Sequence, residues 1–461
     1  MAGCLSSGGV AAISEQAPNF LQIADASLTV APLYIESLDQ EGRGIARRQG
    51  KTIFVEGALP GEQVIVSVYR KKPSFEIANL QRIVKASSSR IEPRCTYFGR
   101  CGGCALQHID VATQVAAKQR VLEDALWRIG KVKADEILAP IHGPAWEYRH
   151  RARFTVRYVQ KKGGMLIGFH EKRSSYVADM KSCEVVPQRI SALLLPLREA
   201  VGGLSIRERL PQIELSVGEG ADVLVLRVLE KLSAHDEHLL AAFADKHKLY
   251  VYLQPGGPDT AQPFHPAAGA DLHYVLPEFD VRIYFAPTDF TQVNHATNRM
   301  LVRRALRLLK PRPGERIADL FCGLGNFSLP IAYLGASVVG LDGSQALAAR
   351  AQTNAVRNGL SDKTRFEVMN LFEMDSDRLA ALGPFDGMLI DPPRDGAVEV
   401  VAAIGEQGPQ RIVYVSCNAS TLARDAAVLV HGGGYRLRSA GVVNMFPHTA
   451  HVESLALFER T

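Results

Sequence analysis

The sequence predicts an α/β fold in which a carboxyl-terminal doubly wound sheet follows a small OB-like barrel and a mixed α+β segment. Three observations predict it. Strands and helices alternate from about residue 290, short strands separated by turns fill residues 27–87, and strands mix with two helical pieces and Gly/Pro turns over residues 139–285.

The first folded segment combines short strands with a concentration of positive charge. Strand signals lie at 28–32, 52–55, 63–69 and 75–84, and glycines and prolines separate them. Between residues 41 and 100, twelve Lys and Arg face five acids, whereas the whole chain has a net charge of only +5. A small barrel with basic loops is typical of oligonucleotide binding, so we expect a polyanion partner at this end.

Composition limits the class of protein. With 461 residues, 47% hydrophobic and 22% charged, the chain can form two or three cores and is not disordered overall. No apolar run approaches the roughly 18 residues of a membrane span. Residues 1–26 lack the features of a signal peptide and are expected to form a loose tail, so we expect a cytoplasmic protein with no membrane partner.

The middle of the chain contains one long helix and one unusual strand. Apolar residues at Val111, Val115, Leu122 and Leu126 predict a helix over residues 107–131. Further on, residues 148–154 form a basic run flanked by aromatic side chains. Solvent-exposed arginines and RNA contact explain this run equally well.

The carboxyl-terminal strands are expected at residues 316–320, 337–342, 366–369, 385–391 and 411–416. Gly323 and Gly325 follow the first strand, and the second ends in Asp342, whose carboxylate could accept hydrogen bonds from ribose hydroxyls. Acidic Asp319 precedes the glycines, and Ser328 replaces the third glycine of a dinucleotide site. A carboxylate there would repel a pyrophosphate but suits a sulfonium, so the loop favours S-adenosylmethionine over NAD.

The later strands end in reactive side chains. Asp391 and Cys417 follow the fourth and fifth strands, so both lie where doubly wound folds bind ligands. The aromatic residue that stacks on adenine in amino-group methyltransferases is replaced by Arg394. Cys417 could be a buried apolar residue, but its polar neighbours favour a thiol that faces the crevice. Glu453 enters a last strand and could be structural, but the pocket otherwise lacks a proton acceptor, which favours a general base.

One reaction requires such a thiol and base. Uracil C5 is a poor carbon nucleophile until a thiolate adds to C6, and a base must then remove the C5 proton.

A cluster of cysteines predicts a metal site. Cys95, Cys101 and Cys104 are closely spaced, and Cys183 is the fourth candidate by elimination. The chain has seven cysteines, and an odd number in a large chain that we expect to be cytoplasmic argues against a disulfide framework. Four thiolates suit either zinc or a [4Fe–4S] cluster, and three close ligands plus a remote one favour the cluster.

Taken together, these motifs resemble the RNA m5U methyltransferases that carry an amino-terminal TRAM domain. The matching motifs are Glu41-Gly-Arg-Gly44, Pro60-Gly-Glu62, Cys101-Gly-Gly-Cys104, Phe290-Thr-Gln-Val-Asn294, Asp319-Leu-Phe-Cys-Gly-Leu-Gly-Asn-Phe327, Asp391-Pro-Pro-Arg394, Ser416-Cys-Asn418 and His451-Val-Glu-Ser454. The likeness covers nearly everything after residue 27. Asp342 departs from the family's common Glu, and Pro393 from a common Ala.

The resemblance implies a class I S-adenosylmethionine methyltransferase that acts on C5 of a uridine in 23S rRNA. It implies a TRAM domain over 27–88, a central domain over 89–106 and 139–289, and a catalytic domain over 107–138 and 290–461. It implies no obligate protein partner. The residues that it implies are Cys417 as nucleophile, Glu453 as base, Gln292, Phe321, Asn326, Asp342, Asn370 and Asp391 for the cofactor, and Cys95, Cys101, Cys104 and Cys183 for a [4Fe–4S] cluster.

Three alternatives stay open: another rRNA site, a tRNA substrate, and a non-catalytic Fe–S RNA-binding protein with a vestigial methyltransferase fold. The presence of both Cys417 and Glu453 favours the enzyme.

Overall fold

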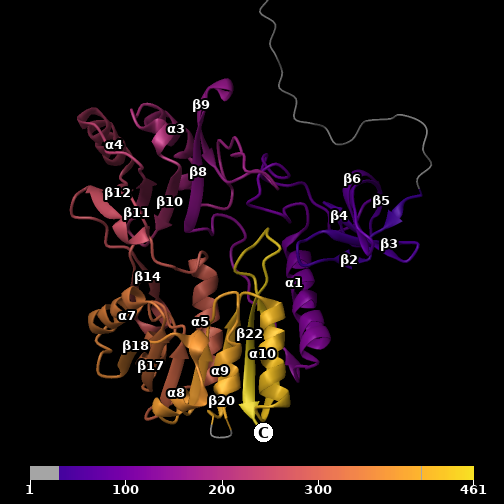
Figure 1. Ribbon diagram of the computed structural model, residues 1–461, viewed down its shortest axis with the longest axis vertical. Coiled ribbons are helices and arrows are strands. Elements are labelled where there is room, and N and C mark those ends of the chain that lie inside the picture. The colour runs from indigo at the N-terminus through magenta and orange to yellow at the C-terminus, as the bar shows by residue number, and fades with distance from the viewer. Residues whose placement is uncertain (1–30, 406–407) are drawn as a thin grey trace, which may run out of the picture. The chain divides into compact units, whose positions relative to one another are not determined.

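A computed structural model describes residues 31–405 and 408–461 (Figure 1). The expected tail over 1–26 and most of the expected strand over 28–32 lie outside these residues. The chain divides into two units, Met1–Asp39 with Arg43–Ser88, and Gln40–Gly42 with Ser89–Thr461. No helix in the described ranges is long and apolar enough to cross a membrane.

The first unit is one six-stranded sheet in the order β1-β5-β6-β4-β3-β2, with β4 and β6 parallel and the other pairs antiparallel. Its small core includes Ile35, Ile53, Val55 and Val64, and the alternation of Ile53 and Val55 with less buried residues gives β4 one buried face. The strands are β1 (Leu33–Tyr34), β2 (Ser37–Leu38), β3 (Gly44–Arg48), β4 (Lys51–Glu56), β5 (Gln63–Lys71) and β6 (Phe75–Lys85).

The second unit begins with a six-stranded central sheet in the order β13-β12-β11-β10-β8-β9. Phe154 and its alternate neighbours on β8 pack with the helices α3 and α4 in one core, while Arg151 and Arg153 project from the opposite face. The elements are β8 (Arg151–Val159), β9 (Gly164–Gly168), α2 (Gln188–Ser191), α3 (Leu194–Gly202), β10 (Gln212–Val217), β11 (Asp222–Arg227), α4 (Ala234–His247), β12 (Tyr250–Gln254) and β13 (Gln262–His265).

An eight-stranded sheet in the order β18-β17-β16-β19-β20-β22-β21-β7 forms the rest of this unit, accompanied by the hairpin β14 (His273–Leu276) and β15 (Val281–Tyr284). The strands from β18 to β20 are parallel, and β22 is antiparallel to both neighbours. The strands are β7 (Glu136–Ile137), β16 (Arg316–Leu320), β17 (Ser337–Asp342), β18 (Thr364–Val368), β19 (Gly387–Ile390), β20 (Arg411–Ser416), β21 (Tyr435–Val443) and β22 (Glu453–Arg460). The predicted doubly wound sheet is confirmed.

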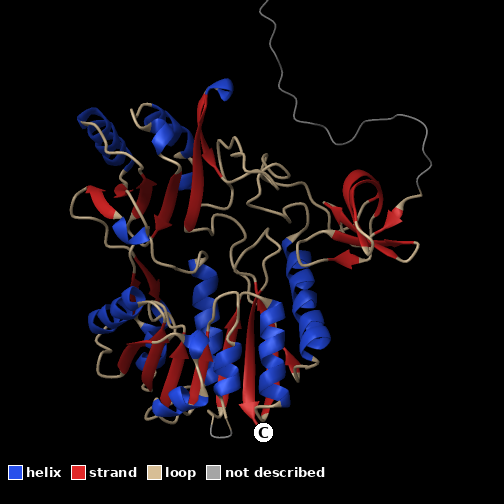
Figure 2. Ribbon diagram, in the orientation of Figure 1, coloured by secondary structure: helices blue, strands red, loops and turns tan. Residues whose placement is uncertain are grey.

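Helices cover both faces of this sheet, and Figure 2 shows them in blue around the red strands. Two apolar cores fill the two interfaces, one with α5 and α6 and the other with α1, α9 and α10. The helices are α1 (Val111–Ala125), α5 (His295–Leu309), α6 (Ser328–Tyr333), α7 (Gln345–Arg357), α8 (Ser376–Ala381), α9 (Val398–Ala403) and α10 (Ala419–His431).

Helix α1 is shorter than the sequence predicts at its amino end. It begins at Val111 because the Asp110 side chain accepts a hydrogen bond from the Thr113 amide (2.9 Å) and caps it there. A π-helical turn extends it over Leu126–Gly130. The helix packs in the core of the eight-stranded sheet, which the segment after it also joins through β7.

Candidate active site

Five of the predicted site residues lie at one edge of the eight-stranded sheet. Phe321, Asp391 and Cys417 directly follow β16, β19 and β20, Asp342 is the last residue of β17, and Asn370 comes two residues after β18. Because these strands are parallel and adjacent, their carboxyl ends share one edge. The edge therefore gathers the predicted cofactor and nucleophile positions.

The loop after β16 gives a ligand close access to the backbone. Gly323 and Gly325 have φ angles of +53° and +88°, and a Cβ at Gly323 would meet no atom within 4 Å. The Asp342 carboxylate accepts hydrogen bonds from the Gly323 amide (3.0 Å) and the Ser344 amide (2.8 Å). These bonds fix the carboxylate at the end of β17 beside an open stretch of main chain.

Asp319 is a fully buried carboxylate near the end of β16, just before this loop. Ser328 donates a hydrogen bond to its Oδ2, but Oδ1 has no partner among the described residues. Burial, together with the charges of Asp391 and Asp342, raises the pKa of Asp319 to about 7. An unpaired buried acceptor beside other carboxylates suits a cationic ligand such as S-adenosylmethionine, whose amino and sulfonium groups are both positive.

The other predicted cofactor residues differ in how accessible they are. Gln292 is nearly buried just before α5, whereas Asn370 is exposed and caps a short helical turn. Asn326 exchanges hydrogen bonds with Asn298 (2.8 and 3.1 Å) and accepts one from the Tyr274 hydroxyl (2.8 Å). Its amide is thus held by neighbours in the protein.

Phe321 has a ring neighbour that the sequence did not single out. Its ring lies 5.7 Å from that of Phe372, which is 43% exposed. Two aromatic rings beside Asp342 provide an apolar surface of the kind that a flat adenine ring contacts.

Cys417 and Glu453 lie opposite each other on neighbouring strands. Ser416 at the end of β20 pairs with Ser454 near the start of β22, and the next residue outward on each strand is Cys417 and Glu453 respectively. Cys417 is partly exposed, whereas Glu453 is only 3% exposed. The antiparallel register thus brings a thiol and a carboxyl group together at the sheet edge.

Burial and negative neighbours raise the pKa of both groups. The pKa of Glu453 is raised to about 8 by burial and by Asp391, and Lys118 opposes this shift. The pKa of Cys417 is raised to about 12 by burial, Glu453 and Asp391, while Arg394 opposes that shift. The thiol is therefore neutral at pH 7 in the free protein, and Glu453, which ionises at lower pH, is the proton acceptor available in the pair.

Two further side chains lie around Glu453: His451, from the predicted His451-Val-Glu-Ser454 motif, and Lys118, which the sequence did not single out. His451 Nε2 lies 3.8 Å from the Glu453 carboxylate, and its Nδ1 lies 3.4 Å from an Arg394 guanidinium nitrogen. Lys118 of α1 is 2% exposed and acts on Glu453 electrostatically. Its position on the stripe of Val115 and Leu122 was the available signal, because a lysine on a buried helix face is unusual.

The four predicted metal-ligand cysteines come together in the fold. Cys101 and Cys183 are buried, Cys95 and Cys104 are partly exposed, and Cys101 lies 3.7 Å from the Met180 sulfur. The pKa of Cys104 is raised to about 12, mainly by burial and in part by Cys183, Cys101 and Cys95. Among residues 31–405 and 408–461, no group of three or more His, Cys, Asp or Glu is arranged to hold a metal ion.

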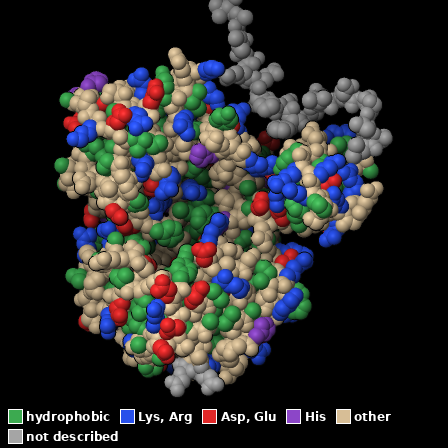
Figure 3. All heavy atoms as spheres, viewed as in Figure 1, with side chains coloured by type: hydrophobic (Ala, Val, Ile, Leu, Met, Phe, Trp, Pro, Cys, Tyr) green, Lys and Arg blue, Asp and Glu red, His purple; other side chains and the backbone are tan. Residues whose placement is uncertain are grey.

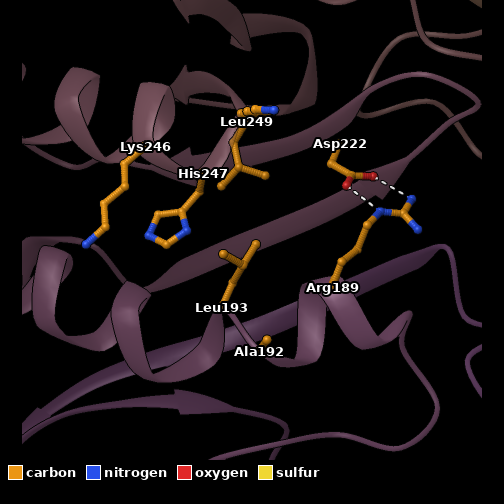
Figure 4. Close-up of a pocket in the computed structure, with 8 residues that line it drawn as sticks. Arg189, Ala192, Leu193, Asp222, Lys246, His247 and Leu249 are labelled. Atoms are coloured by element: carbon orange, nitrogen blue, oxygen red, sulfur yellow. Dashed lines mark hydrogen bonds and ion pairs between the residues drawn. The ribbon is translucent and has the colours of Figure 1, made fainter.

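Two hollows of the second unit contain none of the predicted site residues. One, of about 350 Å³, is lined by Arg189, Asp222 and Lys246 among others, and Figure 4 shows Arg189 paired with Asp222 through two bonds (2.7 and 2.9 Å). The other, of about 410 Å³, is lined in part by Tyr252 and Arg357. Lys and Arg side chains, blue in Figure 3, are spread over the face seen there.

Comparison with known proteins agrees with this architecture. Residues 275–461 match the model of the tRNA (Uracil-5-)-methyltransferase family, and residues 29–75 match the TRAM domain. The solved structure of Pyrococcus abyssi tRNA (uracil-54, C5)-methyltransferase, in complex with S-adenosyl-L-homocysteine, superposes with a TM-score of 0.71. It is 24% identical and covers 93% of this chain and 100% of its own. The fold and site define a class I S-adenosylmethionine-dependent methyltransferase.

Curated relatives show to which family of methyltransferases the chain belongs. The 23S rRNA (uracil(1939)-C(5))-methyltransferase RlmD of Nitrosospira multiformis is 64% identical over 432 residues, which cover 93% of this chain and 98% of the relative. RlmD of Aromatoleum aromaticum is 63% identical over 92% of this chain and 99% of its own length. The chain belongs to the RlmD family of RNA uracil-C5 methyltransferases.

Proposed function

We propose that the chain methylates C5 of uridine 1939 in 23S rRNA, with Cys417 as nucleophile and Glu453 as general base. The choice of uridine follows the names of the relatives, which extend over nearly the whole chain. The observation that carries the mechanism is the register of β20 and β22, which sets the thiol and the carboxyl group opposite each other.

The proposed reaction uses the two side chains in sequence. The Cys417 thiol gives its proton to solvent, and the sulfur forms a bond to C6 of the uracil, which moves the ring electrons toward C5 and O4. S-adenosylmethionine supplies the methyl group that C5 then takes. Glu453 removes the proton from C5, the double bond between C5 and C6 forms again, and Cys417 leaves as a thiolate.

The cofactor would be held along the carboxyl edge of the sheet. Asp342 would accept hydrogen bonds from the ribose, and Phe321 would contact the adenine. Asp391 would accept hydrogen bonds from polar groups near the adenine. Gln292, Asn326 and Asn370 complete the proposed set. The unpaired Oδ1 of Asp319 supports the presence of a cationic ligand, because a buried acceptor without a donor is costly.

We propose a [4Fe–4S] cluster on Cys95, Cys101, Cys104 and Cys183. The donor set fits: there are four thiols, and the pKa values of Cys101, Cys104 and Cys183 are raised in part by other members of the set. Added side chains at the intervening glycines would crowd the site, since a Cβ at Gly103 would lie 3.1 Å from the Phe169 ring.

The cluster proposal has a direct test. Anaerobically purified protein should show the broad visible absorption of an Fe–S cluster and about four irons per chain. The Cys183→Ser variant should lose that absorption, while Cys322→Ser should keep it. A colourless protein with one zinc per chain would contradict the proposal.

The proposed domain limits follow from the sheets. Residues 107–138 would belong with 290–461 in the catalytic domain, because α1 and β7 join the eight-stranded sheet. Residues 89–106 and 139–289 would form the central domain, and 27–88 an RNA-binding TRAM domain. The rRNA substrate supports a cytoplasmic location.

Nucleoside mass spectrometry tests the substrate. Ribosomal RNA from a strain that lacks the gene should lose m5U at position 1939, and the wild-type chain but not Cys417→Ala should restore it. Loss of m5U from tRNA with unchanged rRNA would contradict the proposed substrate. Restoration by Cys417→Ala would contradict the proposed nucleophile.

A further inference from the structure

Helix α1 sends two buried polar side chains toward the loop that connects β21 to β22. Gln114 is fully buried and Lys118 is 2% exposed, and they lie one helical turn apart on the face that also carries Leu122. Burying a lysine costs free energy unless its ammonium is paired and hydrogen-bonded, so we expect Lys118 to have partners that offset this cost.

The two side chains hold the loop in different ways. Gln114 accepts a hydrogen bond from the His448 amide (2.8 Å) and donates to the carbonyls of Leu106 (3.0 Å) and Ile109 (2.9 Å). Lys118 donates to the Asn444 side chain (2.8 Å) and to the Phe446 carbonyl (2.9 Å). An ammonium has three protons, so these two neutral acceptors leave one proton of Lys118 for a further partner.

The loop leads directly into the proposed base. Residues 444–452 connect β21 with Glu453, the first residue of β22. Lys118 contributes two hydrogen bonds to this loop, at Asn444 and at Phe446. A change at Lys118 therefore acts on the strand end where Glu453 sits.

The charges around Glu453 come from several elements. Asp391 after β19 raises the pKa of Glu453, and Lys118 of α1 lowers it. The thiol of Cys417 after β20 interacts with Glu453 as well. In the loop, His451 lies 3.8 Å from the Glu453 carboxylate, but burial lowers the pKa of His451 to about 4 and leaves it neutral at pH 7.

Two other groups could supply positive charge, and neither acts on Glu453. Burial lowers the pKa of His448 to about 4, so that this ring is also neutral at pH 7. Arg394 is exposed and acts on Cys417 and His451. The interaction between Lys118 and Glu453 is mutual: burial lowers the pKa of Lys118 to about 7, and Glu453 opposes that shift, so an ionised Glu453 favours the charged ammonium.

We propose that Lys118 is a positioning residue for the methylation reaction: its ammonium fixes the loop before β22 and supplies the positive charge that favours the ionised Glu453 carboxylate. The proposal rests on the proposed role of Glu453. It gives helix α1 a role in the active site, although Lys118 and its hydrogen-bond partner Asn444 are 326 residues apart in the sequence.

The test measures proton removal separately from methyl transfer. RNA that carries tritium at C5 of the target uridine releases tritium when Glu453 takes the proton, and labelled methyl groups report the preceding step in the same samples. Lys118→Met, Lys118→Arg and wild type are compared in single turnovers from pH 6 to 10. The exposed Lys133→Met serves as the matched control.

For Lys118→Met, we expect tritium release at pH 7 to fall about tenfold or more, since loss of the positive charge raises the pKa of Glu453 by about one unit or more. The rate should approach that of wild type near pH 10, whereas Lys118→Arg and Lys133→Met should keep the wild-type pH profile. An equal loss at every pH, or no loss at all, would overturn the proposal.

Two further variants keep the result interpretable. Lys118→Gln retains an amide donor for the loop without the charge, so it gives the same test if Lys118→Met does not fold. Glu453→Gln separates the two proposals: wild-type tritium release in this variant would show that Glu453 is not the base, whatever the Lys118 variants do.

Discussion

Replacing Glu453 by Gln removes the proposed base and leaves a side chain of nearly the same size. Glu453 is only 3% exposed at the start of β22, so an amide of equal shape should not disturb the strand pairing. The steps that come before proton removal depend on Cys417 and the cofactor. We therefore expect the variant to stop after methyl transfer, with the RNA still joined to Cys417.

The size of the effect follows from the pKa and the role of the group. Removal of a general base slows proton transfer by roughly 10²- to 10⁴-fold. In the wild type, a Glu453 pKa of about 8 leaves roughly one tenth of the protein ionised at pH 7. Only the ionised form accepts a proton, so tritium release should rise about tenfold from pH 7 to pH 9 and then level off.

Two assays follow this prediction. Denaturing gels should show a protein–RNA adduct with Glu453→Gln and unmodified RNA, and single-turnover tritium release should show the pH profile of the wild type. Glu453→Asp is the conservative variant and should retain part of the release rate. Full tritium release by Glu453→Gln, or a wild-type rate that falls as pH rises from 7 to 9, would refute the assignment.

Three other substitutions test separate parts of the site. Asp391→Asn removes a negative neighbour of Cys417, which lowers the pKa of the thiol, and iodoacetamide should alkylate Cys417 about three- to tenfold faster at pH 8; an unchanged rate would contradict the electrostatics. Asp342→Ala should weaken binding of S-adenosylhomocysteine by about 10- to 100-fold in calorimetry, and unchanged affinity would remove this residue from the cofactor site. Leu122→Ala should lower the free energy of unfolding by about 2–5 kcal/mol, since Leu122 is fully buried, whereas half-exposed Val121→Ala should cost less; equal losses would contradict the packing of α1.

The strands of the doubly wound sheet were predictable because each is a short apolar run bounded by turn residues. The expected limits of 316–320, 337–342 and 411–416 agree with β16, β17 and β20. The start of α1 was placed four residues too early, since Asp110 ends the helix by capping it and periodicity alone does not show a cap.

The relation between Cys417 and Glu453 was only partly accessible to sequence analysis. Their positions at strand ends were visible, but the antiparallel pairing of β20 with β22 depends on the strand order, in which β22 inserts between β20 and β21. The contacts of Lys118 could not be predicted from the sequence for a similar reason. Its partners Asn444 and Phe446 come from the far end of the chain, and only packing of α1 on the sheet brings them together.

The central claim is that Cys417 forms a covalent bond with the target uracil during methylation. Fluorine at C5 cannot be removed as a proton, so RNA with 5-fluorouridine at position 1939 should trap that bond when S-adenosylmethionine is present. Mass spectrometry of the digested complex should find the methylated nucleotide attached to the peptide that contains Cys417. An enzyme that methylates natural RNA but gives no adduct at Cys417 would contradict the account.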